Sequence, residues 1–128
     1  MKKTTLLFFI FATLLLNFHF YGQNIEKLYK EVNPSVVTLI TVSKSLKSNY
    51  QVTADSGLGS GVLISETGVI LTAAHVVNNA EKIEVKFLNG EVIPADVIRS
   101  APIADVATIK LSWMPKDYKV SKLGDSDK

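Results

Sequence analysis

The hydrophobic and polar positions after residue 24 predict one short helix followed by a series of short strands. Apolar residues recur at helical spacing from Ile25 to Val32, and Pro34 predicts the end of that helix. Six later segments are rich in β-branched residues or alternate between apolar and polar residues, as strands do. The predicted strands are Ser35–Ser43, Gly59–Ser65, Val69–Thr72, Lys82–Leu88, Glu91–Arg99 and Val106–Leu111.

The segments between these strands contain the turn and loop signals of an antiparallel all-β fold. Asn89 and Gly90 together form the strongest short hairpin signal, and residues 66–68 predict another turn. Lys44–Gly57 is polar without periodicity, so we expect a long surface loop there. Ser112–Lys128 is polar and lacks a strand pattern, which indicates a connecting segment. Six short strands with these turns predict a small antiparallel barrel or sandwich.

The first 22 residues have the pattern of a secretory signal peptide. Lys2 and Lys3 give a positive start, and Leu6–Leu16 is an uninterrupted apolar run of 11 residues. An uncleaved N-terminal anchor over Thr4–Tyr21 is the alternative, although a spanning helix usually needs about 20 apolar residues. Both interpretations place the remaining 106 residues outside the cytoplasm, and that length is enough for one modest core.

Composition and charge exclude several classes of site and partner. Without the two lysines of the leader, the chain has 12 basic and 12 acidic residues, so no net charge draws it toward nucleic acid. The chain has no cysteine, which excludes disulfides, zinc knuckles and a thiol nucleophile. Only two histidines are present, one of them in the leader, so a multi-histidine metal site is excluded and we expect no metal.

His75 and Asp105 are the two candidate catalytic residues, although each has a simpler structural interpretation. His75 follows the predicted strand Val69–Thr72 and has small neighbours, which leave room around an imidazole. A single histidine in an apolar run is otherwise typical of a core residue. Asp105 begins an apolar strand, so we expect it to be partly buried and to need a partner. A turn-capping aspartate has the same local pattern, as Asp96 illustrates.

Taken together, five segments resemble the trypsin-like serine proteases, and specifically the bacterial HtrA/Deg type. Thr72–Val77 and Asp105–Leu111 resemble the histidine and aspartate motifs of that fold. The resemblance extends from Ile25 to Lys128, and the segments follow a secretory leader. The other three segments occur in the family order and are Asn33–Val37, Gly59–Ile64 and Leu123–Asp127.

The resemblance implies a fold of two six-stranded β-barrels with the active site between them. The predicted helix and strands of residues 25–111 would form the first barrel, and residues 112–128 would begin the connection to the second. By the same match, His75 is the general base and Asp105 is the carboxylate that orients it. A serine hydroxyl would attack the peptide carbonyl, so the implied activity is that of a serine endopeptidase acting on unfolded or misfolded polypeptides.

The serine nucleophile of the family has no counterpart in this chain. The family places it in a Gly-Asn-Ser-Gly-Gly-like loop of the second barrel, and no such motif occurs here. Ser60 lies between glycines but precedes His75, where the family has a first-barrel strand, so packing is its better interpretation. Ser112, Ser121 and Ser126 lack a glycine context. We therefore expect the N-terminal half of a serine endopeptidase, catalytically incomplete by itself.

Two other functions stay open from the residues alone. A single barrel could be a non-catalytic interaction module, either secreted or membrane-anchored. An uncleaved leader would instead make the chain a membrane-anchored regulatory fragment. For the protease, the resemblance implies export to the periplasm or cell envelope of a bacterium, no cofactor and no nucleic-acid partner. Contact with the membrane is expected only with an uncleaved leader, and the complete protein could form a homo-oligomer.

Overall fold

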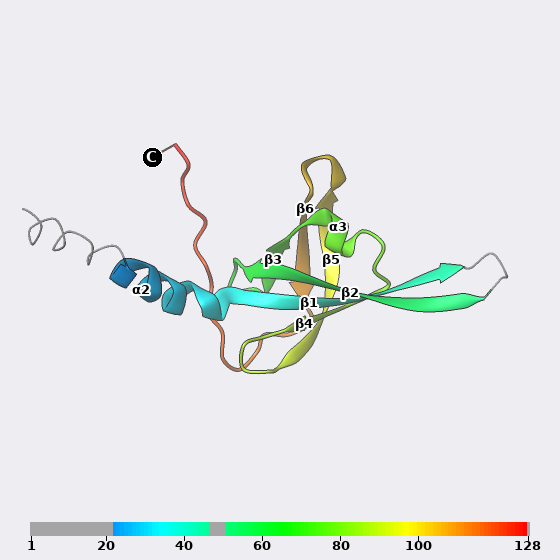
Figure 1. The fold of residues 1–128 in the computed structure, drawn as a ribbon, viewed down its shortest axis with the longest axis horizontal. Helices are drawn as coiled ribbons and strands as arrows, with labels where there is room; N and C mark the ends of the chain where they lie inside the picture. Colours follow the sequence, from blue (N-terminus) through cyan, green and yellow to red (C-terminus); the bar gives the residue numbers. More distant parts are fainter. Residues whose placement is uncertain (1–21, 47–50, 128) are drawn as a thin grey trace, which may run out of the picture. The chain divides into compact units, whose positions relative to one another are not determined.

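A computed structural model describes residues 22–46 and 51–127 of the chain (Figure 1). The predicted leader, residues 1–22, lies outside these described residues except for Gly22. The chain divides into two units, Met1–Glu31 and Val32–Lys128, and the second unit contains the strands β1 to β6.

The predicted N-terminal helix is confirmed and begins three residues earlier than the apolar pattern indicated. Helix α2 spans Gly22–Val32, and the 3-10 helix η2, Asn33–Ser35, follows it. Lys30 Nζ pairs with Glu26 Oε1 at 2.6 Å, one helical turn earlier, which favours the helix modestly. Of the helices in residues 22–46 and 51–127, none has the length and apolar content of a transmembrane span.

The six strands form a closed antiparallel barrel, so the barrel rather than the sandwich is confirmed (Figure 1). Neighbouring strands follow the order β1-β2-β3-β6-β5-β4, and the pairing of β4 with β1 closes the sheet. Closure gives each of the six strands a hydrogen-bonded neighbour on both sides, over at least part of its length. The bounds are β1 (Val36–Leu46), β2 (Val52–Leu63), β3 (Val69–Thr72), β4 (Lys82–Lys86), β5 (Val92–Ala101) and β6 (Val106–Leu111).

The barrel interior is filled by side chains that the alternating pattern places on one strand face. In β4, Ile83 and Val85 are buried while Lys82 and Lys86 are exposed. The same alternation in the other strands produces one continuous apolar core, and its burial is the main contribution to folding. The largest completely buried apolar side chains are Leu39, Leu63, Ile70, Val85, Ile93 and Ile109.

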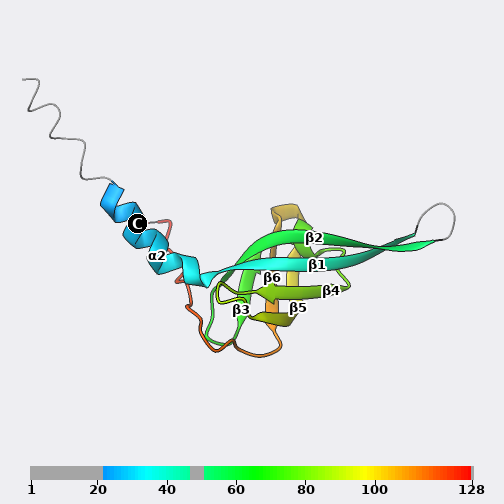
Figure 2. The same cartoon turned by 60° about the horizontal axis from the view of Figure 1, so that its bottom comes forward.

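The expected surface loop over Lys44–Gly57 is wrong for most of its length. Strand β1 continues to Leu46 and β2 begins at Val52, and these two residues are paired across the ladder. Within the described residues, 43–46 pair only with 52–55, and neither segment pairs with a third strand. The two segments form a two-stranded arm that extends beyond the other strands (Figure 2). Because the arm has no core to cover, its sequence needs no apolar face, although its backbone forms a regular ladder.

The predicted turn at Asn89 and Gly90 is confirmed as the link between β4 and β5. The backbone N–H of Phe87 donates to the carbonyl of Glu91 at 2.9 Å, and the N–H of Gly90 donates to the carbonyl of Phe87 at 2.9 Å. Gly90 has a φ of +88°, a conformation that side chains disfavour. The link is longer than the Asn-Gly pair and consists of residues 87–91, because β4 ends at Lys86 and β5 begins at Val92.

Residues 112–127 contain no helix or strand, as expected for a connection, but the first ten of them are fixed to the barrel. Pro115 is buried, and backbone N–H groups of this segment donate to acceptors on three different strands or turns. The segment is therefore part of the barrel unit at least as far as residue 121. The donor and acceptor pairs are Ser112 with Pro94 O (3.0 Å), Lys116 with Glu91 Oε2 (3.1 Å) and Ser121 with Leu63 O (2.9 Å).

Candidate active site

His75 lies on α3, a single helical turn over Ala74–Val77 that begins two residues after β3. A helix of four residues is unstable by itself, so packing must hold it in place. Ala74 and Val77 are 0% and 2% exposed, whereas the side chain of His75 is 73% exposed. The buried neighbours anchor α3 over the barrel core and leave the imidazole accessible to solvent.

Asp105 lies between the 3-10 helix η3, Pro102–Ala104, and the start of β6. Its φ of 50° is in the left-handed region, which aspartate tolerates better than most residues. The N–H of Asp105 donates to the carbonyl of Pro102 at 3.1 Å and closes the turn. Such a conformation at a residue other than glycine is typical of functional sites.

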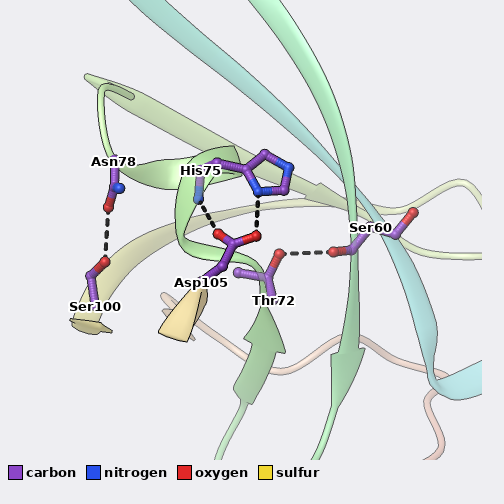
Figure 3. Close-up of polar contacts among 6 residues, drawn as sticks. All are labelled: Ser60, Thr72, His75, Asn78, Ser100 and Asp105. Carbon is purple, nitrogen blue, oxygen red and sulfur yellow. Dashed lines mark hydrogen bonds and ion pairs between the residues drawn. The ribbon is translucent and has the colours of Figure 1, made fainter. Parts of the chain in front are cut away.

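The structure brings His75 and Asp105 together through two hydrogen bonds (Figure 3). Asp105 Oδ2 lies 2.7 Å from Nδ1 of the imidazole, and Asp105 Oδ1 accepts from the backbone N–H of His75 at 2.9 Å. One carboxylate therefore fixes both the ring and the backbone of a residue 30 positions away. Since an ionised carboxylate only accepts, Nδ1 carries the proton, and Nε2 of the neutral ring is left as the basic nitrogen.

The expectation that Asp105 is partly buried is wrong, because the residue is exposed and 53% of its side-chain surface is accessible. The carboxylate is stabilised by hydrogen bonds rather than hidden in the core. The backbone N–H of His75, and next its imidazole, lower the pKa of Asp105 below its ordinary value of 3.8. Asp105 is therefore ionised at neutral pH and can stabilise a positive charge on the imidazole.

Two contacts with β2 support the segment that carries His75. Thr72, the last residue of β3, is buried, and its hydroxyl donates to the carbonyl of Ser60 at 2.8 Å (Figure 3). Gly59 lies directly under Val76 of α3, where a Cβ atom would be only 2.4 Å from Val76 Cγ1. The absence of a side chain at Gly59 thus lets α3 pack closely against β2.

The structure does not join any of the serines considered above to the candidate pair. Ser60 is exposed, and Figure 3 shows its side chain pointing away from the imidazole. Ser112, Ser121 and Ser126 lie in the segment after β6, and in the described residues none of them has a hydrogen bond to His75.

One further contact near His75 has no counterpart in the sequence pattern. Ser100 Oγ on β5 donates to Asn78 Oδ1, directly after α3, at 2.8 Å. The two residues are 22 positions apart and both are exposed, so neither periodicity nor hydrophobicity could have paired them.

A cleft of about 320 Å³ opens beside the imidazole, between α3 and the β1–β2 hairpin. Thr41, Ser43 and Leu58 line its strand side, and His75 and Val76 line its helix side. In residues 22–46 and 51–127, no three histidine, aspartate or glutamate side chains gather as ligands for a metal ion.

A family model described as a trypsin-like peptidase domain matches residues 59–128 of the chain. The match includes both His75 and Asp105. A solved HtrA-type protease with a decapeptide has the same fold, with a TM-score of 0.72 and 26% sequence identity, over 80% of this chain and 36% of that chain.

Curated relatives are similar to this chain over a part of their length only. Serine protease HTR4 of Rattus norvegicus is 37% identical over 102 residues, which cover 80% of this chain and 20% of the relative. Serine endoprotease DegS of Haemophilus influenzae is 35% identical over 62% of this chain and 24% of the relative. Periplasmic serine endoprotease DegP of Salmonella typhimurium is 41% identical over 55% of this chain and 15% of the relative. The chain thus spans a quarter or less of the length of these three relatives.

Proposed function

Because the chain belongs to the trypsin-like peptidase family, we propose that it supplies the general base and the orienting carboxylate of an HtrA-type serine endopeptidase. The observation that carries this proposal is the double hydrogen bond between Asp105 and His75. It sets the tautomer and the orientation of an exposed imidazole, which are the properties that a general base in this reaction needs.

In the proposed reaction, His75 Nε2 takes the proton of a serine hydroxyl while the serine oxygen bonds to the peptide carbonyl carbon. Asp105 remains ionised and stabilises the imidazolium that forms. When the tetrahedral intermediate collapses, the C–N bond breaks and His75 returns the proton to the leaving amine. Water then repeats the sequence on the acyl-enzyme and releases the second product.

We propose that this chain is catalytically inactive without further polypeptide. It contains a base and a carboxylate, but no Gly-Asn-Ser-Gly-Gly-like loop that would supply the nucleophile and oxyanion donors. Residues 112–128 would be the connection to the part that carries this loop. Exposed apolar side chains next to Asp105 support the proposal, since Ile103 is fully exposed and Val106 is 43% exposed.

The substrates we propose are unfolded or misfolded polypeptides, and the place of action is the periplasm or cell envelope of a bacterium. The decapeptide in the solved HtrA-type protease and the cleft beside His75 support a polypeptide substrate. The periplasmic relative and the pattern of residues 1–22 support export, by a cleaved signal peptide or an anchor. A homo-oligomer of the complete protein, and the absence of a nucleic-acid partner, belong to the same proposal.

A non-catalytic single-barrel interaction module is the second candidate. The specific observation in its favour is that the barrel closes by itself around a continuous core. A monomeric chain that unfolds cooperatively would favour the module. A chain that aggregates through the apolar surface next to Asp105 would favour the incomplete protease.

Labelling with a fluorophosphonate probe tests the protease proposal. We expect no labelling of this chain, and labelling of a serine once the chain is extended by the second barrel of an HtrA-type relative. His75→Ala in the extended protein should abolish the labelling. Asp105→Asn should reduce it strongly, whereas Asp96→Asn, a matched change at an exposed aspartate on β5, should leave it unchanged. Normal labelling and peptide cleavage with His75→Ala would refute the proposal.

A further inference from the structure

Asn78 and Ser100 form a second bridge between α3 and the connection that carries Asp105 (Figure 3). Asn78 directly follows α3, and its N–H donates to the carbonyl of Ala74 at 2.9 Å, so its backbone moves with the helix. Ser100 is the last residue but one of β5, and η3 follows that strand. Asn78 and Ser100 are both exposed, so a specific hydrogen bond rather than burial joins them.

The two bridges hold α3 at opposite ends. Near its start, the N–H of His75 donates to Asp105 Oδ1, and directly after its end, Asn78 Oδ1 accepts from Ser100. Ser100 lies near the end of β5 and Asp105 lies directly after η3, so only residues 101–104 separate them in the chain. A helical turn joined to this part of the chain at one point can pivot there, whereas a turn joined at both ends cannot.

An irregularity in β5 directs Ser100 toward α3. The register between β5 and β6 shifts between Val97 and Arg99, and beyond this bulge Ser100 pairs with Ala107. Cross-strand partners project from the same sheet face, so Ser100 shares the face of Ala107, although Ser100 itself is exposed. Without the extra residue, alternation would turn Ser100 to the opposite face. Bulges commonly redirect a side chain in this way next to active sites.

We propose that Asn78 and Ser100 are positioning residues that hold His75 within hydrogen-bonding distance of Asp105. Packing does not restrain the two side chains, because 73% of His75 and 53% of Asp105 are exposed. Water competes for both groups at the surface, so their contact depends on how firmly the two backbones are held together. The catalytic value of the bridge rests on the proposed function, but its effect on the geometry of the pair does not.

Amide hydrogen exchange of the full chain, resolved residue by residue, tests the bridge. In Asn78→Ala and in Ser100→Ala, the amide of His75 should exchange about 2- to 10-fold faster. This factor of about 2 to 10 corresponds to the usual net free energy of one hydrogen bond. The amides of Leu39 and Ile109, in the core strands, should exchange at the wild-type rate. The titration midpoint of Asp105, followed by carbon NMR, should rise toward 3.8 in the same variants.

Two further variants separate positioning from general stability. Ser100→Thr keeps the hydroxyl donor and should restore both readouts to wild-type values. Asn79→Ala removes a neighbouring asparagine side chain that has no hydrogen bond to β5 in the described residues, and should change neither readout. The proposal would be overturned if the His75 amide exchanged at the wild-type rate in the alanine variants, or if all core amides exchanged faster to the same extent. It would also be overturned if only one of the two alanine variants responded, or if Ser100→Thr did not keep the wild-type values. Failure of the extended protein to label with the bridge intact would instead refute the protease function alone.

Discussion

Substitution of Gly59 by alanine tests how closely α3 must approach the barrel for His75 to be held in place. A Cβ atom at Gly59 would be 2.4 Å from Val76 Cγ1, 2.9 Å from Cγ2 and 3.2 Å from Cβ. Carbon atoms in contact prefer a separation of about 3.5–4.0 Å, so α3 or the Val76 side chain must move by about 1 Å. The backbone of Gly59 is not in the left-handed region, so the penalty is steric.

The expected change in the free energy of unfolding follows from two opposing effects. Overpacking of this kind typically costs about 1–3 kcal/mol. Alanine in place of glycine restricts the conformations of the unfolded chain, which stabilises the folded state by about 0.4–1 kcal/mol. We therefore expect Gly59→Ala to lower the free energy of unfolding by about 1–2 kcal/mol. Val76→Ala removes the atoms that clash, and by itself should cost about 1 kcal/mol because Val76 is only half-buried.

The assay is urea unfolding of the wild type, both single variants and the double variant, followed by circular dichroism. If the clash is the cause, the double variant should be more stable than the sum of the single effects predicts, by about 1 kcal/mol or more. Gly124→Ala is the matched control, because a Cβ there would meet no atom within 4 Å. Single effects of Gly59→Ala and Val76→Ala that add to within about 0.5 kcal/mol would refute the reasoning.

Three other predictions concern the site and one turn. In His75→Ala, the pKa of Asp105 should rise above its wild-type value but stay below 3.8. The largest cause of the lowered pKa is the backbone N–H of residue 75, which alanine keeps. Carbon NMR titration measures this pKa. Since the pKa of Asp105 is lowered by folding, its ionised form stabilises the protein above pH 3.8, and this stabilisation is lost as the pH falls through the folded pKa. Asp105→Asn should therefore unfold less steeply with acid than the wild type, and an identical acid profile would contradict the assignment. Gly90→Ala should cost about 1–2 kcal/mol in urea unfolding because its φ is +88°, whereas Gly124→Ala should be nearly neutral.

The strand positions were predictable because most strands cover a core. In β4, for example, Ile83 and Val85 alternate with charged residues, and burial of one face leaves that period of two in the sequence. The arm formed by residues 43–46 and 52–55 was missed for the same reason. Its ladder satisfies backbone groups alone, and a polar strand pair without a core has no hydrophobic period.

In the candidate site too, some features were predictable from the sequence and others were not. His75 and Asp105 could be named from motifs that resemble a protease family, but their residue types and spacing do not show a contact across 30 positions. The exposure of Asp105 was misjudged, because an apolar strand follows it and the turn before that strand lies at the barrel rim. Asn78 and Ser100 left no local signal, since exposed polar residues are common in turns.

By itself, the sequence determined the class of the fold, the turns that need glycine and the two residues that could move a proton. These properties depend on local chemistry: periodic burial, permitted φ angles and the reactivity of an imidazole and a carboxylate. Only the tertiary structure decided in which order the strands pair around the barrel, that β1 and β2 extend as an arm, and that Asp105 meets both the ring and the backbone of His75. Those outcomes depend on contacts between distant residues, and the free energy of such contacts exists only after the chain has folded.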